Sequence, residues 1–223
     1  MLKFLATAAT AVLIAGAAQA SVIQNGDFEL GPTNNGLINN NSFSAMNGQS
    51  GNRSWDVWTT LPGWTTAAGN GIEIQTRRTI GGADPQSGDH YVELDSHPKA
   101  GGNSTMQQSV QLDVGTYRLS YWYQPRTNKP NDNVLSVLFD GAEIARHDET
   151  SSSQAGWAQY FADIEVSTAG DYGLAFAAAG LETSLGALID NVDLSPVPVP
   201  AALPLLATGL GGIALWRRRQ RHG

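Results

Sequence analysis

The sequence predicts an all-β protein that forms a β-sandwich over residues 21–196. No segment of this region repeats its apolar residues with the 3.6-residue period of a helix. Apolar and polar residues instead alternate along several short runs, as they do in strands that bury one face. Clusters of Gly, Asn, Asp and Ser separate these runs at short intervals. Many short strands divided by frequent turns are typical of an all-β sandwich.

The clearest strands lie in the second half of this region. Residues 117–123 place four apolar or aromatic side chains on one face and Arg118, Ser120, Trp122 and Gln124 on the other, so only one face can be core. Asp140-Gly141 between residues 134–139 and 143–145 predicts a hairpin with a two-residue turn. Residues 160–166, 174–178 and 188–194 also alternate. Residues 31–52 are rich in Asn, Gly and Ser and predict a long surface loop.

Five short motifs follow one another through this region, and their order resembles galactose-binding-like jelly rolls. They are N-G-D-F-E (25–29), L-P-G-W (61–64), G-D-H-Y-V-E-L-D (88–95), G-T-Y-R-L-S-Y-W-Y (115–123) and I-D-N-V (189–192). That superfamily includes several carbohydrate-binding modules and a plant cell-wall family of unknown function. The resemblance implies a jelly-roll β-sandwich and specifies the ligand poorly.

The first 20 residues resemble a secretory signal peptide. Lys3 precedes an apolar run from Phe4 to Ala18, and Ala18-Gln19-Ala20 has the small-x-small pattern of a signal-peptidase site. Cleavage is therefore expected before Ser21. The working domain is then residues 21–196, the length of a single domain.

The last 27 residues, 197–223, have the order of parts of a membrane-sorting tail. A Pro-containing hinge precedes 16 uncharged residues, 201–216, and four arginines follow. As a helix this stretch would span roughly 24 Å, somewhat less than a hydrocarbon core of about 30 Å. The arginines favour the cytoplasmic side, so the domain would lie outside the cytoplasm.

The tail resembles the PEP-CTERM class, in particular its V-P-L-P-A variant. The motif stands here as Val197, Pro198, Val199, Pro200 and Ala201, with Val199 in place of Leu. The resemblance implies an exosortase partner, an integral-membrane transpeptidase that recognises the motif and leaves the helix and basic end behind. It implies transient anchoring in the inner membrane, then transfer to the cell surface or exopolysaccharide matrix. The alternative is an ordinary C-terminal membrane anchor.

Charge and cysteine content exclude several classes of function. Lys3 and the four tail arginines account for five of the 13 basic residues, whereas all 20 acids lie in residues 21–196, which therefore carry a net charge of −12. Such a domain is a poor partner for nucleic acid. The absence of cysteine excludes disulfides, thiol catalysis and Cys-based zinc sites.

A structural calcium ion is implied by the jelly-roll resemblance. Members that bind such an ion take one acid from the N-G-D-F-E segment and one from the closing strand, which correspond to Glu29 and Asp190 here. Asp27 and Asp193 lie beside them in sequence. Carboxylate oxygens suit Ca²⁺. The alternative is that these acids cap backbone amides or form a solvated edge.

Aromatic residues suggest a polysaccharide partner, since indole faces stack on sugar rings. Trp122, Trp157, Trp55 and Trp58 are the candidate ligand-binding residues, whereas Trp64 in the P-G-W motif is expected in the core. Trp122 is the best placed, because alternation sets it opposite the tyrosine face of residues 117–123.

The sequence favours a protein that is not an enzyme. Glu73, Asp89, Glu93 and Asp95 offer carboxylate pairs for glycoside hydrolysis, but acids at alternate positions are typical of an exposed strand face. No nucleophile elbow or phosphate-binding loop occurs. We therefore expect glycan binding or a structural role in an extracellular matrix. A glycoside-active enzyme on the same scaffold and a protein-binding adhesin module are the alternatives.

Overall fold

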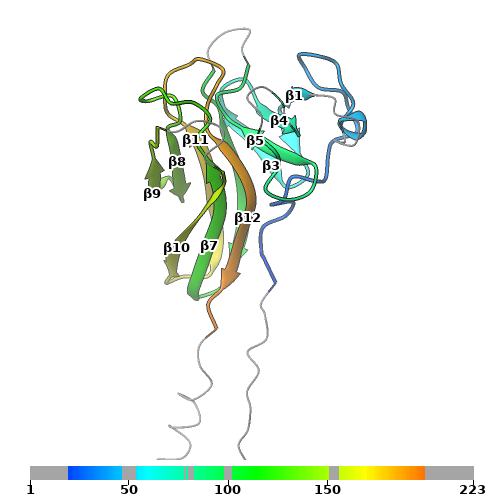
Figure 1. The fold of residues 1–223 in the computed structure, drawn as a ribbon. Coiled ribbons are helices and arrows are strands. Elements are labelled where there is room, and N and C mark those ends of the chain that lie inside the picture. Colours follow the sequence, from blue (N-terminus) through cyan, green and yellow to red (C-terminus); the bar gives the residue numbers. More distant parts are fainter. Residues whose placement is uncertain are drawn as a thin grey trace, which may run out of the picture. The chain divides into compact units, whose positions relative to one another are not determined.

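The computed structural model describes residues 20–46, 54–77, 79, 83–97, 102–150 and 156–198. Residues 20–196 form one compact unit, an all-β sandwich of two six-stranded antiparallel sheets (Figure 1). The predicted fold class is confirmed at this level. The signal peptide, most of the sorting motif and the predicted membrane helix at 201–216 lie outside the described residues. Within them, no helix is long and apolar enough to cross a membrane.

The first sheet has the strand order β1-β4-β5-β12-β7-β10. Its central strand β12 pairs with β7 along most of its length but with β5 only at Leu188 and Ile189. The strands are β1 (Trp55–Trp58), β4 (Ile72–Thr76), β5 (His90–Glu93), β12 (Leu188–Pro196), β7 (Gly115–Gln124) and β10 (Ala158–Val166).

The second sheet has the order β2-β3-β6-β11-β8-β9 and packs against the first through the apolar core. Its strands are β2 (Thr60–Leu61), β3 (Trp64–Ala68), β6 (Thr105–Leu112), β11 (Gly170–Ala178), β8 (Leu135–Phe139) and β9 (Ala142–His147). A three-residue 3₁₀ helix, η1 (Phe43–Ala45), lies in the segment predicted as a long loop.

The alternation in residues 117–123 is the alternation of burial in β7. Tyr117, Leu119, Tyr121 and Tyr123 are buried in the core. The other face of β7, which carries Trp122, points away from the second sheet. Trp64 is fully buried in the same core, as expected, and its Nε1–H donates to the carbonyl oxygen of Asn25 at 3.0 Å.

The predicted hairpin is the β8–β9 pair. Asp140 and Gly141 connect the two strands and both have positive φ, 48° and 79°. A turn of this kind follows the right-handed twist of antiparallel strands, which explains the Asp-Gly pair.

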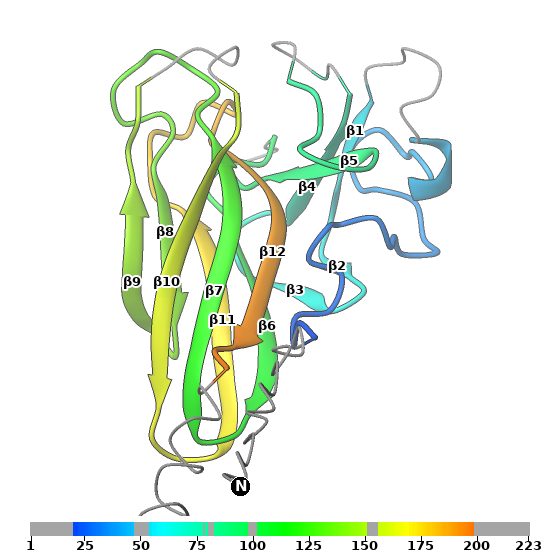
Figure 2. The ribbon, with the colours of Figure 1, turned by 60° about the horizontal axis from the view of Figure 1, so that its bottom comes forward.

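The N-terminal segment, residues 21–28, runs beside the second half of β12. Val22 N–H donates to the carbonyl of Leu194, and Val192 N–H donates to the carbonyl of Gly26. Figure 2 shows this segment next to β12. One edge of β12 thus pairs first with β5 and then with the N-terminal segment, so the two ends of the domain lie together.

Candidate functional site

A bulge in β12 marks the place where its partner changes. The pairing of β12 with β7 shifts register between Asp190 and Asp193, and Asn191 has a positive φ of 46°. Asparagine tolerates this conformation better than most residues. The Asn191 side chain donates through Nδ2 to Gln86 and to the Ser87 hydroxyl, which secures the bulge against residues 86–87.

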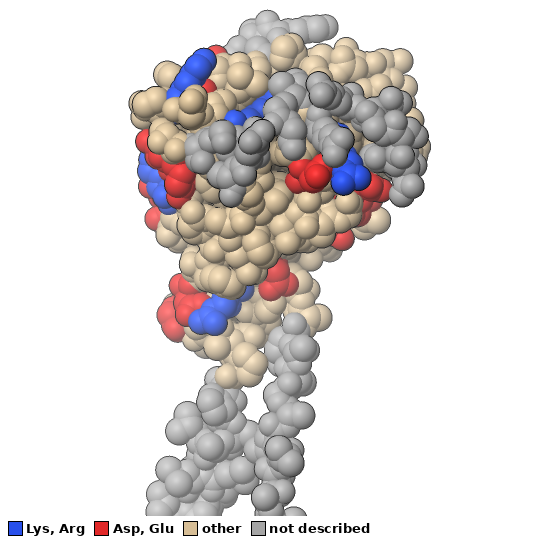
Figure 3. Space-filling model, in the orientation of Figure 1, with Lys and Arg blue, Asp and Glu red and all other residues tan. Residues whose placement is uncertain are grey.

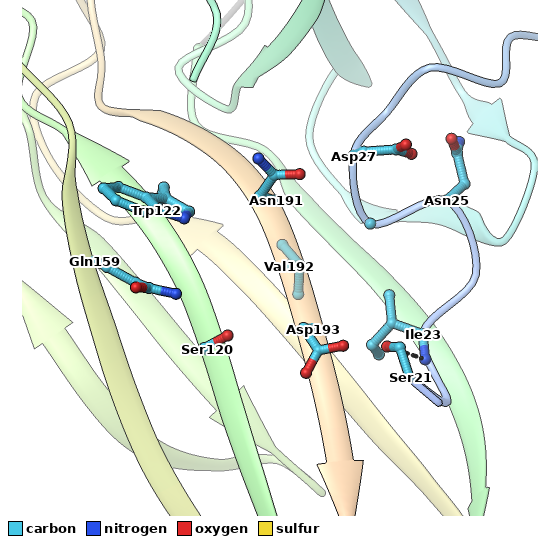
Figure 4. Close-up of a pocket in the computed structure, with 11 residues that line it drawn as sticks. Ser21, Ile23, Asn25, Asp27, Ser120, Trp122, Gln159, Asn191, Val192 and Asp193 are labelled. Carbon is cyan, nitrogen blue, oxygen red and sulfur yellow. Dashed lines mark hydrogen bonds between the residues drawn. The ribbon is translucent and has the colours of Figure 1, made fainter. Parts of the chain in front are cut away.

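The bulge opens a groove of about 450 Å³ on the outer face of the first sheet. Figure 4 shows Trp122 and Gln159 on one side of β12 and Asn25 and Asp27 on the other. The remaining lining residues come from β7, β12 and the N-terminal segment: Ser120, Asn191, Val192, Asp193, Ser21, Ile23 and Gly26.

The groove combines an aromatic ring with polar groups that have no partner within the described chain. Trp122 is half-buried, and its Nε1–H has no acceptor there; the Gln159 amide and Ser120 hydroxyl likewise make no hydrogen bond with the described residues. Asn25 is different, since its amide group bonds the backbone of Leu30 and the carbonyl of Pro62. Asn25 therefore shapes the groove, whereas the first three groups remain available to a ligand.

The four tryptophan candidates have different positions. Trp122 alone among them lines the groove. Trp58 is fully buried and packs edge-on against Phe43 with ring centroids 5.9 Å apart, so it is not a ligand platform and that prediction is wrong. Trp58 ends β1 with its indole in the core cluster, a position that the clustering of tryptophans in the sequence does not reveal.

Trp157 and Trp55 are half-buried away from this groove. Trp157 donates through Nε1 to the carbonyl of Asp84 at 2.9 Å and packs edge-on against Tyr91. Trp55 lies edge-on to His97, with ring centroids 4.9 Å apart, on the edge strand β1. Each therefore has a packing partner of its own.

The carboxylate of Glu29 receives N–H donors from the segment before β5. It accepts hydrogen bonds from the backbone N–H of Asp89 at 2.8 Å and of His90 at 2.9 Å, and its other oxygen lies 2.8 Å from His90 Nδ1. Burial opposes ionisation, but the hydrogen bonds from His90 and Asp89 outweigh it, and the pKa of Glu29 lies below its ordinary value.

Asp190 binds residues 86–87, a few positions before the residues that Glu29 binds. Its carboxylate accepts from the backbone N–H of Gln86 at 2.8 Å, of Ser87 at 3.2 Å and of Asn191 at 2.7 Å. Burial raises the pKa of Asp190 to about 7, although these backbone hydrogen bonds oppose the shift.

Glu29 and Asp190, as placed, do not fit a calcium ion. Their oxygens face N–H donors, whereas Ca²⁺ needs six to eight oxygen ligands. In the described ranges no group of three Asp, Glu or His side chains is arranged to hold a metal ion, and Asp27 and Asp193 line the groove instead. The geometry is that of the amide-capping alternative, and calcium binding stays a prediction for experiment.

Three of the four acids considered for hydrolysis are buried, which contradicts the exposed strand face expected from their spacing; the fourth, Asp89, is half-buried just before β5. Glu93, Asp95 and Glu73 are 0%, 1% and 3% exposed. Gln75 donates through Nε2 to both Glu73, at 2.7 Å, and Glu93, and Arg126 forms a buried ion pair with Glu93. These residues cover the outer face of β4 and β5 with a polar cluster that loops enclose.

Burial shifts the protonation of this cluster. It raises the pKa of Glu73 to about 7, against hydrogen bonds from the His97 N–H and Gln75. It also raises the pKa of Glu93, a shift that the Arg126 guanidinium opposes. One cation among three buried carboxyl groups favours retention of a proton in the cluster near neutral pH.

Sequence reasoning named neither Gln159 nor Ser120 as a site residue, although both line the groove and make no hydrogen bond with the described residues. Ser120 shares the outward face of β7 with Trp122, and the register pairs Trp122 with Gln159. The alternation around residues 160–166 was visible in the sequence, but which strand lies beside β7 was not. Only the strand pairing brings the amide to the tryptophan.

The described surface has basic residues that are largely paired with acids. Arg118 makes a two-point contact with Asp163 at 2.7 and 2.9 Å, and Arg77 and Arg146 contact Asp84 and Glu143. The face in Figure 3 shows basic side chains beside acidic ones and no broad basic area.

Comparison with known proteins yields similarity of fold. No family model and no curated protein matches the sequence. A similar solved structure is the Stig cyclase Fisc from Fischerella sp. TAU, with 16% identity and a TM-score of 0.50 over 82% of this chain and 100% of that chain.

Two further structures are more distant. The K1 cleaved adhesin domain of Lys-gingipain from Porphyromonas gingivalis W83 has 16% identity and a TM-score of 0.44, covering 66% of this chain and 99% of that chain. The CBM35 from Paenibacillus barcinonensis has 17% identity and a TM-score of 0.38, covering 65% and 99%. At such identities the likeness concerns the fold alone.

Proposed function

We propose that this protein is an exported, non-enzymatic β-sandwich protein that binds a glycan through the groove beside β12. The observation that carries the proposal is the half-buried Trp122 indole, which shares the groove with the carboxylates of Asp27 and Asp193. The Gln159 amide and the Ser120 hydroxyl, which the described chain leaves unpaired, lie in the same groove. A sugar ring offers an apolar C–H face to an aromatic ring and hydroxyl groups to such polar partners.

The size of the groove agrees with a ligand of a few sugar units. Its volume of about 450 Å³ falls in the range of sites for small molecules, roughly 300 to 1,000 Å³. Gln159 lies directly opposite Trp122 across the β7–β10 pair, so the ring and an amide reach the same ligand. A hollow with an available aromatic side chain favours a glycan over the flat protein-binding surface of an adhesin.

Burial of the carboxyl groups is the reason we favour binding over hydrolysis. Glycoside hydrolysis needs two carboxyl groups on either side of the sugar linkage. Glu73, Glu93 and Asp95 are enclosed and hydrogen-bonded to protein groups. Asp27 and Asp193 line the groove, one in the N-terminal segment and the other on β12.

The proposal includes the galactose-binding-like jelly-roll type of this sandwich and the sorting route. The protein would be exported, held in the inner membrane by residues 201–216, and passed by an exosortase to the cell surface or exopolysaccharide matrix. Intact-mass analysis of protein from the native host tests this route. A mature C-terminus within residues 197–201 would support sorting, whereas retention through Gly223 would leave a plain membrane anchor.

Glycan arrays and pull-down with insoluble polysaccharides test the binding function, with the wild-type chain and two tryptophan variants. Trp122→Ala should weaken binding at least about tenfold, because truncation of a central aromatic contact costs about 2 kcal/mol or more. Trp55→Ala, on the edge strand β1, is the matched control and should bind as the wild type does. No retention of the wild-type chain by any glycan would end the proposal.

A further inference from the structure

The groove beside β12 has an unbalanced charge. None of the 11 residues that line it is basic, whereas two, Asp27 and Asp193, are carboxylates. Asp27 lies in the N-terminal segment on one side of β12, and Asp193 lies on β12 itself (Figure 4). A ligand in the groove would therefore face negative charge from two elements.

Both carboxylates retain acceptor capacity. Asp27 is exposed, and its contact with the described chain is a long one of 3.5 Å from the Glu29 N–H. Asp193 accepts the Ser195 hydroxyl through Oδ2, and its Oδ1 has no donor among the described residues. Neither group forms an ion pair with another residue that the structure describes.

Asn191 adds a further hydrogen-bond acceptor to the groove. Asn191 uses its Nδ2 group on Gln86 and Ser87, which leaves Oδ1 as an acceptor beside Asp193. A ligand suited to this side must bring several N–H or O–H donors.

The arginine on the outward face of β7 is already paired with an acid. Arg118 lies two residues before Ser120 on the same outward face of β7, but both of its contacting nitrogens bond Asp163. The net charge of −12 on residues 21–196 adds to the repulsion of any polyanion within a Debye length, about 8 to 10 Å at ordinary salt.

We infer that the ligand is a glycan with protonated amino groups, such as a hexosamine polymer with free amines, rather than a uronate or a fully N-acetylated chain. This inference rests on the glycan-binding function proposed above. An ammonium group supplies both the positive charge for Asp27 and Asp193 and three donors for the acceptors around it. The Trp122 ring holds the sugar face, and a cation near an indole is further stabilised by the ring.

The inference predicts a charge-dependent order of affinities. Calorimetric titration of the full chain with hexamers of glucosamine, N-acetylglucosamine and galacturonate should give the tightest binding for glucosamine. The preference over N-acetylglucosamine should be about tenfold at low salt and should fall toward unity at about 0.5 M salt, because exposed charges are then screened.

Three single substitutions assign the preference to the groove. Asp193→Asn and Asp27→Asn should each reduce the affinity for the glucosamine hexamer severalfold and leave that for the N-acetylglucosamine hexamer unchanged. Asp171→Asn removes an exposed acid from β11 of the other sheet and is the matched control, which should change neither. Thermal melting of each variant confirms that it is folded.

The outcomes separate this inference from the function on which it rests. Equal binding of the three hexamers, preference for galacturonate, or an equal loss in Asp171→Asn would overturn the amine preference. If Trp122→Ala then still abolishes binding of any hexamer, the glycan function stands. If no hexamer binds, the amine preference fails, and the glycan arrays and pull-down decide separately whether the glycan function stands.

Discussion

Glu73→Gln should flatten the pH dependence of folding stability. Glu73 is buried, and its two oxygens accept hydrogen bonds from Gln75 Nε2 and the His97 N–H, each at 2.7 Å. Burial raises the pKa of this carboxyl group from 4.5 to about 7. Between these values the folded protein binds a proton that the unfolded chain has released. Glu73 thus contributes stability that is present at low pH and is lost as the pH rises toward 7.

The magnitude follows from the shift. A shift of about 2.5 pH units, from 4.5 to about 7, corresponds to about 3 kcal/mol, since one unit is about 1.4 kcal/mol. Glutamine cannot ionise, so the free energy of unfolding of the variant relative to the wild type should rise by about this amount between pH 4.5 and pH 7.5. The glutamine of the variant also places its amide N–H against the N–H of either Gln75 or His97. This contact lowers the free energy of unfolding by about 1 to 2 kcal/mol at every pH. The quantity to compare is therefore the slope of the free energy of unfolding against pH.

Urea denaturation followed by tryptophan fluorescence across this pH range measures the effect. Glu182→Gln, at an exposed position, serves as the control and should run parallel to the wild type. Asp190 has a raised pKa too, and because it is present in both proteins its contribution cancels in the difference. Parallel curves for Glu73→Gln and wild type would show that burial does not hold a proton on Glu73, and the reasoning would be refuted.

Three further predictions concern the core, a turn and the predicted ion. Trp58→Ala should lower the free energy of unfolding by about 3 to 5 kcal/mol in urea denaturation, because it empties a fully buried core position; a change below about 1 kcal/mol would mean that the indole is not packed. Gly141→Ala should cost about 1 kcal/mol, since nothing obstructs a Cβ there but its φ is 79°; unchanged stability would contradict the strained turn. Calcium and chelator should leave the melting temperature unchanged, because Glu29 and Asp190 accept N–H donors; a rise with calcium would show that they become ligands.

Local sequence predicted the second half of the sandwich well. The alternation in residues 117–123 and the Asp140-Gly141 pair act between near neighbours, so strand faces and a hairpin follow without knowledge of the rest of the chain. The strands between residues 55 and 76 were not individually predicted. β4, for example, alternates Ile72 and Ile74 with Glu73 and Gln75, but its polar face is buried as well.

The candidate site depended on longer-range pairing. Trp122 was identified from its face of the strand, but Gln159 reaches it only because β10 pairs with β7. Glu73 and Glu93 were expected on an exposed strand face but are buried. Their spacing on strands is the same whether loops cover the face or leave it open. The alternation within a strand does not reveal whether distant segments cover one of its faces.

The sequence by itself determined the all-β class, the outward position of Trp122, the negative charge of residues 21–196 and the expectation of export. These properties follow from side-chain type and period along one segment. The tertiary structure decided which acids are enclosed, that Glu29 and Asp190 receive backbone N–H donors, and that Asp27 and Asp193 meet Trp122 in a groove. Those facts depend on the bulge in β12 and the N-terminal segment beside it, whose pairing joins residues more than 160 positions apart and leaves no local pattern.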